Sequence, residues 1–276
     1  MTRTVLITGC SSGIGAATAS RLSRAGWEVW ATARRPETLA DLAEAGCRTT
    51  ALDVTDEASM TAAVEQVLAS SGRIDALVNN AGYSQSGAIE SLDLDDVRRQ
   101  FETNVFGLLR LTQLVLPAMR EQRSGRIVNI GSMGGRVTFP GGGAYHASKY
   151  AVEAISDALR FEVAGFGIKV VLVEPGLITT SFDEKVTAGM PTGEGPWAEF
   201  NEKVAAATVG AYDGPIARFG GPPEAVAAVI EKAVTKARPK PRYTVTVSAP
   251  VAIVTRKLLG DRGWDLAMRS QFPQPR

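Results

Sequence analysis

Short apolar runs rich in β-branched residues alternate along the chain with longer segments whose apolar residues recur every three to four positions. The first pattern predicts strands covered on both faces, and the second predicts helices. Their alternation predicts a parallel sheet with right-handed crossovers. We therefore expect an α/β fold, with a doubly wound, mainly parallel seven-stranded sheet and helices on both faces. The expected strands are residues 3–8, 27–32, 48–52, 74–78, 126–130, 168–173 and 243–247, and the expected helices are 14–25, 37–45, 59–70, 94–119, 144–164 and 223–236.

The length of 276 residues is enough for one domain with a proper core. We expect residues 1–276 to form that single domain. One stretch interrupts the alternation, because residues 183–223 are rich in Gly and Pro and have weak periodicity. A long connection of this kind is more often functional than accidental.

The charge balance argues against a polyanionic partner. Lys and Arg total 30 and Asp and Glu total 29, so the net charge of +1 creates no long-range field for nucleic acid. The two cysteines, Cys10 and Cys47, have no metal or redox spacing and are expected to be packing residues in a reducing compartment. No apolar run approaches the ~18 residues that span a bilayer. We expect a cytoplasmic protein without a metal, a nucleic-acid partner or a membrane anchor.

The stretch TVLITGCSSGIGAAT near the amino terminus has two incompatible interpretations. Gly9, Ser11 and Gly13 have the G-x-S-x-G spacing of a hydrolytic serine, but that chemistry needs a histidine late in the chain. The one histidine, His146, lies in a mid-chain helical segment. Gly9, Gly13 and Gly15 also fit a loop that holds a dinucleotide pyrophosphate at a helix N-terminus. This second interpretation is favoured, although a glycine loop alone is a weak signal.

Tyr145 and Lys149 are four residues apart, which places them on one helix face. A free tyrosine has a pKa of ~10, and a nearby ammonium group lowers it. The pair is therefore a candidate acid/base device near neutral pH. Ser132 ends an expected strand, where its hydroxyl would hold a substrate carbonyl oxygen. The alternatives are a surface tyrosine beside a solvated lysine, and a serine in an ordinary glycine-rich turn.

Taken together, these motifs resemble the short-chain dehydrogenase/reductase family. The matching pieces follow the family's order over residues 4 to about 182, and they are T-G-x-x-x-G-I-G at Thr8 to Gly15, N-N-A-G at Asn79 to Gly82, Asn104, Ser132, Y-x-x-x-K at Tyr145 and Lys149, and P-G at Pro175 and Gly176. The glycine spacing is similar to that of the compact single-domain branch. The sequences Y-H-A-S-K and K-P-R-Y-T-V resemble those of the hydroxysteroid and retinol dehydrogenase-like members of the family.

The resemblance implies a catalytic role for four residues. Tyr145 would be the general acid in reduction and the base in oxidation. Lys149 would bind the nicotinamide ribose and lower the pKa of Tyr145, and Ser132 would orient the carbonyl. Asn104 would hold a water in a proton relay to Lys149. His146 is expected to have a structural role, because its place beside Tyr145 on the helix turns it elsewhere.

The resemblance also implies a Rossmann-type cofactor site. Asp53 would accept a hydrogen bond from the adenine amino group, and the Ile178 backbone would lie near the carboxamide. Thr179 is the rival to Thr180 in the P-G-x-x-x-T register. The expected cofactor-binding residues are Gly9, Ser11, Ser12, Gly13, Ile14, Gly15, Arg34, Asp53, Val54, Asn80, Ala81, Gly82, Tyr145, Lys149, Pro175, Gly176, Ile178 and Thr180.

The residues after the second expected strand bear on the choice of cofactor. An acid there would bind the 2′-hydroxyl of NAD, but its position is occupied by Ala33, followed by Arg34 and Arg35. Arginine suits a 2′-phosphate. We predict that NADP(H) is preferred over NAD(H), with Arg34 as the main contact and Ser12 as a candidate helper. The alternative is two solvated arginines before a helix.

The sequence defines the substrate less closely than the reaction or the cofactor. Residues 183–223 occupy the family's substrate-lid position and carry several large apolar residues, which implies a hydrophobic alcohol or ketone. The alternative is that these residues only pack the lid on the core. Residues 250–276 match the family core poorly and form a C-terminal extension.

Rival functions are a catalytically idle NADP-binding sensor or scaffold, and a reductase of small polar carbonyls. Members of the family often pair their long helices, which implies a homodimer or homotetramer with subunit contacts through residues 94–119 and 144–164.

Overall fold

The computed structural model describes residues 2–179, 190–191, 194–272 and 274. Within them, seven strands form one sheet in the order β3-β2-β1-β4-β5-β6-β7, and all neighbouring strands are parallel. The doubly wound sheet predicted from the sequence is therefore confirmed. The strands are β1 (Thr4–Ile7), β2 (Glu28–Ala33), β3 (Arg48–Ala51), β4 (Ala76–Asn79), β5 (Gly125–Ile130), β6 (Ile168–Pro175) and β7 (Arg242–Val245).

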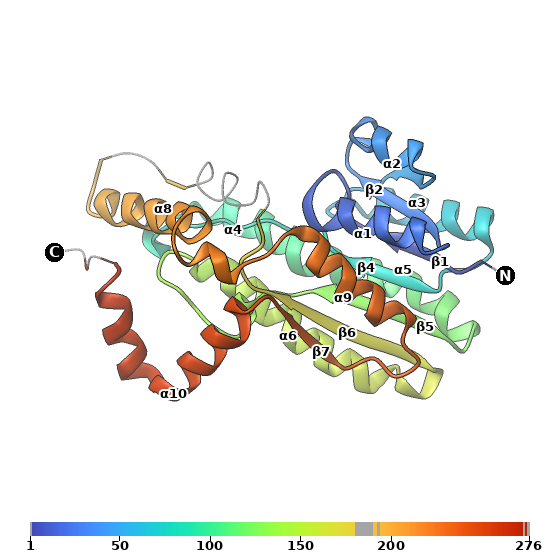
Figure 1. The fold of residues 1–276 in the computed structure, drawn as a ribbon. Coiled ribbons are helices and arrows are strands. Elements are labelled where there is room, and N and C mark those ends of the chain that lie inside the picture. Colours follow the sequence, from blue (N-terminus) through green and yellow to red (C-terminus); the bar gives the residue numbers. More distant parts are fainter. Residues whose placement is uncertain (1, 180–189, 192–193, 273, 275–276) are drawn as a thin grey trace.

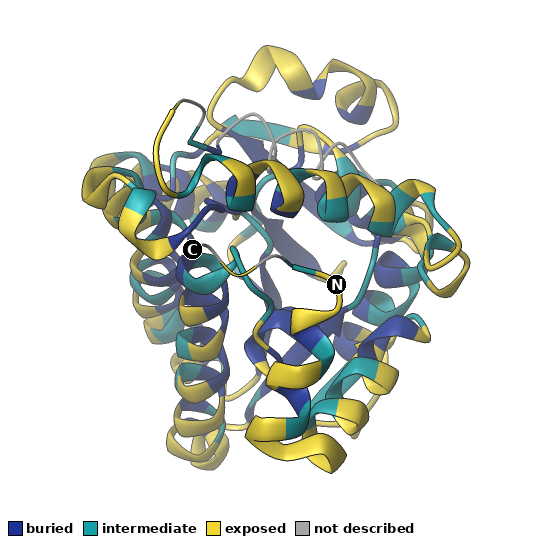
Figure 2. Ribbon diagram, turned by 90° about the vertical axis from the view of Figure 1, so that its left-hand side faces the viewer, coloured by how far each residue is buried: buried dark blue, intermediate teal, exposed yellow. Residues whose placement is uncertain are grey.

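Helices cover both faces of the sheet (Figure 1). They are α1 (Gly13–Arg24), α2 (Ala40–Glu44), α3 (Glu57–Ser71), α4 (Leu94–Phe101), α5 (Leu108–Glu121), α6 (Gly143–Glu162), α8 (Ala198–Asp213), α9 (Pro223–Thr235) and α10 (Ser248–Arg269). Strand side chains alternate between the faces. Val5 and Ile7 therefore join a core under α1 and α9, whereas Leu6 joins a second core under α3 and α5. Figure 2 shows the buried strands enclosed between helices whose outer sides are exposed.

The long helix expected over residues 94–119 is interrupted. Between α4 and α5 the chain forms a π-helix, Glu102–Gly107. Such a wider turn inserts one extra residue, and it occurs frequently at functional sites. The hydrophobic period alone did not reveal it. Asn104 lies inside this π-helix and is only 2% exposed.

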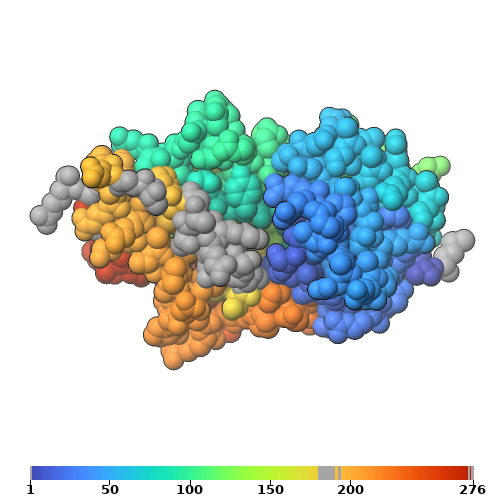
Figure 3. All heavy atoms as spheres, turned by 90° about the horizontal axis from the view of Figure 1, so that it is seen from above, coloured from blue at the N-terminus to red at the C-terminus, as the bar shows by residue number. Residues whose placement is uncertain are grey.

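Two helices occupy stretches for which the sequence pattern predicted no element. Helix α8 lies within residues 183–223, and α10 covers most of the tail. In Figure 1 both lie at the end of the molecule opposite the N-terminus. The periodicity of α10 is broken at Gly260, where φ is 60° and two helical pieces meet at a kink. Seen from above in Figure 3, the first part of the chain (blue) and α8 (light orange) lie at opposite ends, whereas α9 (orange) reaches back to pack against α1.

The strand order places the candidate site. The chain runs outward in one direction from β1 to β3 and in the other from β4 to β7, so the order reverses between β1 and β4. Ligands of doubly wound sheets bind beyond the carboxyl ends of the strands at this point. The loops that follow β1, β4, β5 and β6 carry the four main motifs, and this topology brings them to one edge.

Helix α3 offers a local test of the fold. Its N-cap, Asp56, accepts hydrogen bonds from the amides of Ala58 at 2.9 Å and Ser59 at 3.3 Å. Replacing Asp56 with alanine leaves those donors to water, and we expect the free energy of unfolding to fall by about 1 kcal/mol. Urea denaturation at neutral pH measures it. A variant that matches the wild type would show that the cap contributes nothing, whereas Asp56→Asn is the control that retains an acceptor.

The described helices include none that is both long and apolar enough to cross a bilayer. Among the same residues, no cluster of three or more His, Cys, Asp and Glu side chains is arranged to hold a metal ion. Cys10 and Cys47 are buried free thiols. Burial raises the pKa of Cys10 to about 12, which makes its thiol a packing group rather than a nucleophile.

Candidate active site

The glycine loop after β1 is a tight turn against which α1 packs closely. Gly9 and Gly13 have positive φ values of 70° and 57°, a conformation that glycine adopts without strain. A Cβ atom on Gly15 would lie only 2.2 Å from the carbonyl oxygen of Gly9. The Asn80 amide, which follows β4, donates to the carbonyls of Thr8 at 2.9 Å and Gly9 at 3.0 Å and so fixes the loop from outside.

The start of α1 suits an anion. Ser12 is the N-cap, its side chain makes no capping hydrogen bond, and the first turn contains no acidic residue. The first amides of a helix have no partner within it, and the helix dipole is positive at this end. Ser11 and Ser12 are exposed, and Gly13 and Ile14 are partly exposed. This cradle has the chemistry that suits the pyrophosphate of a dinucleotide, the group expected here from the sequence.

The turn after β5 carries Ser132. Its hydroxyl oxygen accepts a hydrogen bond from the amide of Gly134 at 3.0 Å, which closes a short 3₁₀ turn, Met133–Gly135. The Ser132 side chain also forms a hydrogen bond with the phenol of Tyr145. The structure therefore brings together two of the predicted catalytic side chains, which lie 13 residues apart in sequence.

Helix α6 supplies Tyr145 and Lys149 on one face, as the spacing predicted. The Lys149 ammonium lies 5.9 Å from the centroid of the Tyr145 ring and donates to the carbonyl of Ile130 at 2.8 Å. Burial lowers the pKa of Lys149 to about 8, against the opposing effect of the Glu153 carboxylate.

The expected lowering of the Tyr145 pKa by Lys149 is wrong for this structure. Desolvation raises the pKa of Tyr145, and the hydrogen bond with Ser132 opposes that rise only in part. The sequence argument considered the ammonium charge and left out the cost of moving a phenolate out of water, which is the larger effect here.

Asn104 lies in the π-helix and joins three segments. Its amide nitrogen donates to the carbonyl of Tyr83 at 2.9 Å and to the hydroxyl of Ser148 at 3.0 Å, and its oxygen accepts from the amide of Tyr83 at 3.1 Å. A Cβ atom on Gly82 would lie 3.0 Å from the Asn104 oxygen and 3.8 Å from the Lys149 nitrogen. The N-N-A-G loop, Asn104 and Lys149 are therefore neighbours. The backbone amide of Ala81 donates a hydrogen bond of 3.0 Å to the hydroxyl of Thr8.

The remaining predicted cofactor residues lie beyond β3 and β6. The Asp53 carboxylate accepts from the amide and hydroxyl of Thr55 at 2.9 and 2.8 Å, and Val54 is buried beside it. Pro175 ends β6, and the Gly176 amide donates a hydrogen bond of 3.0 Å to the carbonyl of Val245. Ile178 is buried and pairs with Gly221. Thr180 lies outside the described residues, and its rival Thr179 donates its amide to Gly221 at 3.0 Å.

Arg34 follows the last residue of β2 and is exposed. Its charge lowers the pKa of Tyr83, as does that of Arg99, although burial raises this pKa overall. Arg34 therefore lies near enough to Tyr83, in the loop after β4, for its charge to act there. Within the described part of the chain it makes no ion pair, so its charge is available to an anionic ligand.

His146 lies behind the Ser132 turn rather than in the site. It is 7% exposed and its Nδ1 lies 3.0 Å from the carbonyl oxygen of Gly134. Burial lowers its pKa from 6.5 to about 4, so the ring is neutral near pH 7. Its ring centroid is 5.6 Å from that of Tyr145 and 5.9 Å from that of Phe139. This packing agrees with the structural role expected from the sequence.

Helix α10 supports the same turn from outside. The Trp264 indole donates to the carbonyl of Thr138 at 3.1 Å, and its ring meets Phe139 edge-on at 5.5 Å. Phe272 packs against the apolar cluster of Val137, Trp264 and Met268 and also against that of Met190 and Val204, of which Val204 lies on α8. The C-terminal extension and α8 are thus joined into one apolar wall beside the residues that follow Ser132.

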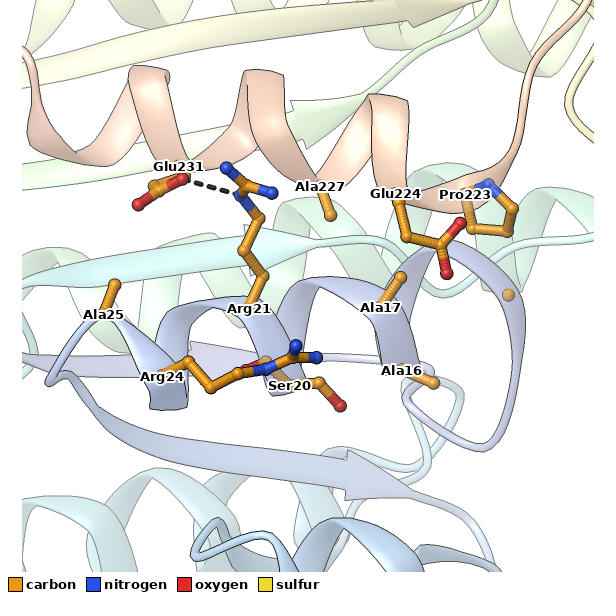
Figure 4. A pocket seen from close by; sticks show the side chains of 11 residues that line it. Ala16, Ala17, Ser20, Arg21, Arg24, Ala25, Pro223, Glu224, Ala227 and Glu231 are labelled. Carbon is orange, nitrogen blue, oxygen red and sulfur yellow. Dashed lines mark hydrogen bonds and ion pairs between the residues drawn. The ribbon is translucent and has the colours of Figure 1, made fainter.

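A separate groove of about 640 Å³ lies between α1 and α9 (Figure 4). It is lined mainly by small residues and by an ion pair of 2.6 Å between Arg21 and Glu231. Of the predicted site residues only Gly13 borders it. The groove is therefore distinct from the edge where Ser132, Tyr145 and Lys149 meet.

Sequence reasoning missed several residues that shape the site. Tyr83 acts through its backbone and Ser148 through a hydroxyl inside a helix, and neither gives a sequence signal of its own. Glu153 and Glu174 are buried acids behind the site. Glu174 was detectable in principle, because it is an acid at the end of the otherwise apolar strand segment VVLVEP and acids are rarely buried unless paired.

Comparisons with known proteins agree with this geometry. A family model described as short chain dehydrogenase matches residues 3–191. An uncharacterized oxidoreductase, YbbO of Escherichia coli (strain K12), is 38% identical over 96% of this chain and 93% of its own length. A 3-ketodihydrosphingosine reductase of Bacteroides thetaiotaomicron is 44% identical over 69% of each chain. A solved short-chain dehydrogenase from Streptomyces avermitilis superposes with a TM-score of 0.81 at 37% identity, covering 98% of this chain and 99% of that one.

The family match covers more than half of the chain, and a relative similar over nearly its whole length is an oxidoreductase. The glycine cradle at α1 and the lysine beside the N-N-A-G loop are consistent with the nicotinamide cofactor that this family uses. The protein belongs to the short-chain dehydrogenase/reductase family and is an NAD(P)-dependent oxidoreductase.

Proposed function

We propose that the protein is an NADP(H)-dependent oxidoreductase that interconverts a hydrophobic alcohol and its ketone or aldehyde, with Tyr145 as the acid/base. The observation that carries the proposal is the convergence of three side chains. The Tyr145 phenol is hydrogen-bonded to Ser132, and the Lys149 ammonium is 5.9 Å from the centre of the same ring.

Each residue has a defined task in carbonyl reduction. The bound nicotinamide supplies or accepts the hydride. Ser132 donates a hydrogen bond to the substrate oxygen, and Tyr145 gives that oxygen its proton. In oxidation Tyr145 takes the proton back. Lys149 holds the cofactor ribose and stabilises the phenolate as it forms, and Asn104 holds a water that links Lys149 to solvent.

Arg34 is proposed as the main contact of the 2′-phosphate, which gives a preference for NADP(H) over NAD(H), with Ser12 as its helper. The proposal is supported by the exposed Arg34 guanidinium after β2, which has no ion pair among the residues that the structure describes, and by Ala33 in the position of an acid. For Arg34→Ala we expect the Kd of NADPH to rise by roughly 10- to 100-fold, since a hydrogen bond to a charged group contributes about 1.5–3 kcal/mol. Fluorescence titration measures it.

The Kd of NADH is the internal control, because NADH lacks the 2′-phosphate and we expect it to change little. Arg35→Ala is the matched control variant, since Arg35 is the exposed neighbour. Equal weakening of both cofactors by Arg34→Ala would contradict a contact with the 2′-phosphate.

The hydrophobic substrate is supported by the apolar wall that α8 and α10 form beside the Ser132 turn. A relative named for reduction of a keto compound, 3-ketodihydrosphingosine, is consistent with ketone reduction by this chain. We propose that residues 183–223 act as the substrate lid and 250–276 as an extension that completes the apolar wall. Binding energy then comes mainly from buried apolar surface.

A panel of carbonyl compounds tests the proposal against its two rivals. NADPH oxidation is followed with ketones and aldehydes of increasing apolar size and with small polar carbonyls, at equal concentrations. We expect kcat/KM to rise with apolar size. Turnover of polar carbonyls alone would favour the second rival, and tight NADPH binding without turnover would favour the sensor or scaffold.

A homodimer or homotetramer is proposed through α4, α5 and α6. Large apolar side chains lie exposed on α4, on the π-helix and on α6, at Leu94, Phe106, Tyr150 and Phe161. Exposed apolar groups on neighbouring helices are typical of subunit contacts. Light scattering during size exclusion should give two or four times the mass of 29.2 kDa. A monomer at micromolar concentration would contradict the proposal.

A further inference from the structure

Two carboxyl groups lie buried behind the candidate active site. Glu153 is on α6 and 7% exposed, and Glu174 is on β6 and 1% exposed. The Arg242 guanidinium of β7 contacts both, with its Nε 3.1 Å from Glu153 Oε2 and 3.5 Å from Glu174 Oε1. Arg136, in the turn after Ser132, reaches Glu174 Oε1 at 3.3 Å. The buried pair is therefore held by two cations.

The contact between the two acids requires a proton. Glu153 Oε1 is buried and receives no hydrogen bond from a nitrogen or hydroxyl donor in the described residues. The Glu174 carboxyl reaches the same Arg242 Nε as Glu153 and lies close enough to the Glu153 carboxyl for a hydrogen bond between the two acids. Two ionised carboxylates are both acceptors, so this bond exists only when one of them is protonated. Burial and the Glu174 charge raise the pKa of Glu153 to about 8, although Arg242 opposes the rise.

The pair adjoins the Ser132 turn and Lys149. Glu153 lies one helical turn after Lys149, and its charge raises the Lys149 pKa. A Cβ atom on Gly135 would lie 3.2 Å from Glu153 Oε1 and 3.0 Å from the Lys149 carbonyl oxygen. One on Gly131 would lie 3.3 Å from the same Oε1. The carboxyl of Glu153 therefore lies beside Gly131 and Gly135, which stand on either side of Ser132.

We propose that Glu153 and Glu174 are positioning residues that share one proton and, through their remaining negative charge, keep Lys149 protonated beside Tyr145. The inference rests on the proposed roles of Tyr145 and Lys149. The charged groups that face the pair are Lys149 and Asp157 from α6, Arg242 from β7 and Arg136 from the Ser132 turn. The shared proton comes from solvent and is not passed to the substrate.

The pair changes its charge as the pH rises. Near pH 7 it carries one negative charge. When the shared proton leaves, a second negative charge appears one helical turn from Lys149 and holds that ammonium charged to a higher pH. The alkaline limit of activity is therefore set in part by two acids that do not touch the substrate.

Two substitutions separate this role from simple packing. In Glu153→Gln the amide takes the place of the protonated carboxyl and still donates to Glu174, so kcat/KM at pH 7 should stay within about twofold, because the charge of the pair is unchanged. The alkaline limb of its pH profile should move down by roughly one pH unit, since an opposite charge at this range shifts a pKa by 1–3 units. Glu153→Gln/Glu174→Gln removes the one negative charge that the pair carries at pH 7 and should lose activity at that pH as well.

Asp157→Asn is the matched control. Asp157 binds the same Arg242 but is 44% exposed, so its loss loosens the arginine without changing the charge of the pair. We expect its pH profile to follow the wild type. An alkaline limb that stays in place in Glu153→Gln, or a loss of activity by the same factor at every pH, would overturn the inference in favour of a packing role.

A titration of the wild-type protein supplies a readout independent of activity. With ¹³C-labelled glutamate carboxyls, one NMR resonance should titrate near pH 8 and be absent in Glu153→Gln. If every glutamate titrates in its ordinary range, the shared proton is refuted even where the kinetics agree. If Tyr145→Phe proves fully active, the proposed function fails instead, and the carboxyl titration is unaffected.

Discussion

Replacing Tyr145 with phenylalanine is expected to lower kcat/KM for ketone reduction by roughly 10²- to 10⁴-fold, the usual contribution of a positioned general acid. Phenylalanine keeps the ring packed against His146 and beside Lys149, but it removes the hydroxyl that bonds Ser132. The Kd of NADPH should change only slightly, because the cradle at α1 and Arg34 are untouched. Steady-state NADPH oxidation with the best ketone of the panel measures the effect.

Tyr150→Phe is the matched control for this substitution. Tyr150 lies on the same helix, five residues further on, and is 44% exposed. It should keep wild-type kinetics. Retention of more than a tenth of the activity by Tyr145→Phe would remove Tyr145 from the acid/base role, since general acids contribute roughly 10²-fold or more.

The second large effect concerns acid stability. The pKa of His146 falls from 6.5 to about 4 in the folded protein because burial disfavours the charged ring. The unfolded chain therefore binds this proton below pH 6.5 while the folded protein does not. The stability that the neutral ring preserves is fully present above pH 6.5 and is lost as the pH falls toward 4. We expect this residue to account for a loss of roughly 3 kcal/mol, since each pKa unit equals about 1.4 kcal/mol.

The difference between the wild type and His146→Asn isolates this contribution. The variant should be less stable at pH 7, because the contacts of the ring with Phe139 and the Gly134 carbonyl are lost. Its stability should nevertheless fall less steeply between pH 6.5 and 4. Urea denaturation at several pH values measures both curves. Parallel curves would show that the pKa of His146 is not depressed.

The strands were predictable because they are short, apolar runs bounded by motif residues. The sequence placed the ends of β1, β4 and β5 next to Thr8, Asn79 and Ser132, and the sheet order then brings these motifs together. The i and i+4 spacing of Tyr145 and Lys149 is a local property of a helix, and it survives in the structure. Local periodicity and motif order were therefore sufficient for the fold and for the position of the site.

The remaining features depend on tertiary contacts that one sequence does not reveal. The hydrophobic pattern predicted neither the π-helix at Asn104 nor the break of α10 at Gly260. The rise in the Tyr145 pKa depends on how far the phenol is removed from water. Glu153 and Glu174 are 21 residues apart and meet only because α6 packs on β6. None of these contacts follows from spacing alone.

A crystal structure of the protein with NADP⁺ and the alcohol product of its best ketone tests the central claim most directly. The account predicts that the alcohol oxygen lies within hydrogen-bond distance of both Tyr145 Oη and Ser132 Oγ, with the carbinol carbon facing the nicotinamide ring and Lys149 on the ribose. An alcohol bound with its oxygen away from these two hydroxyls would contradict the account.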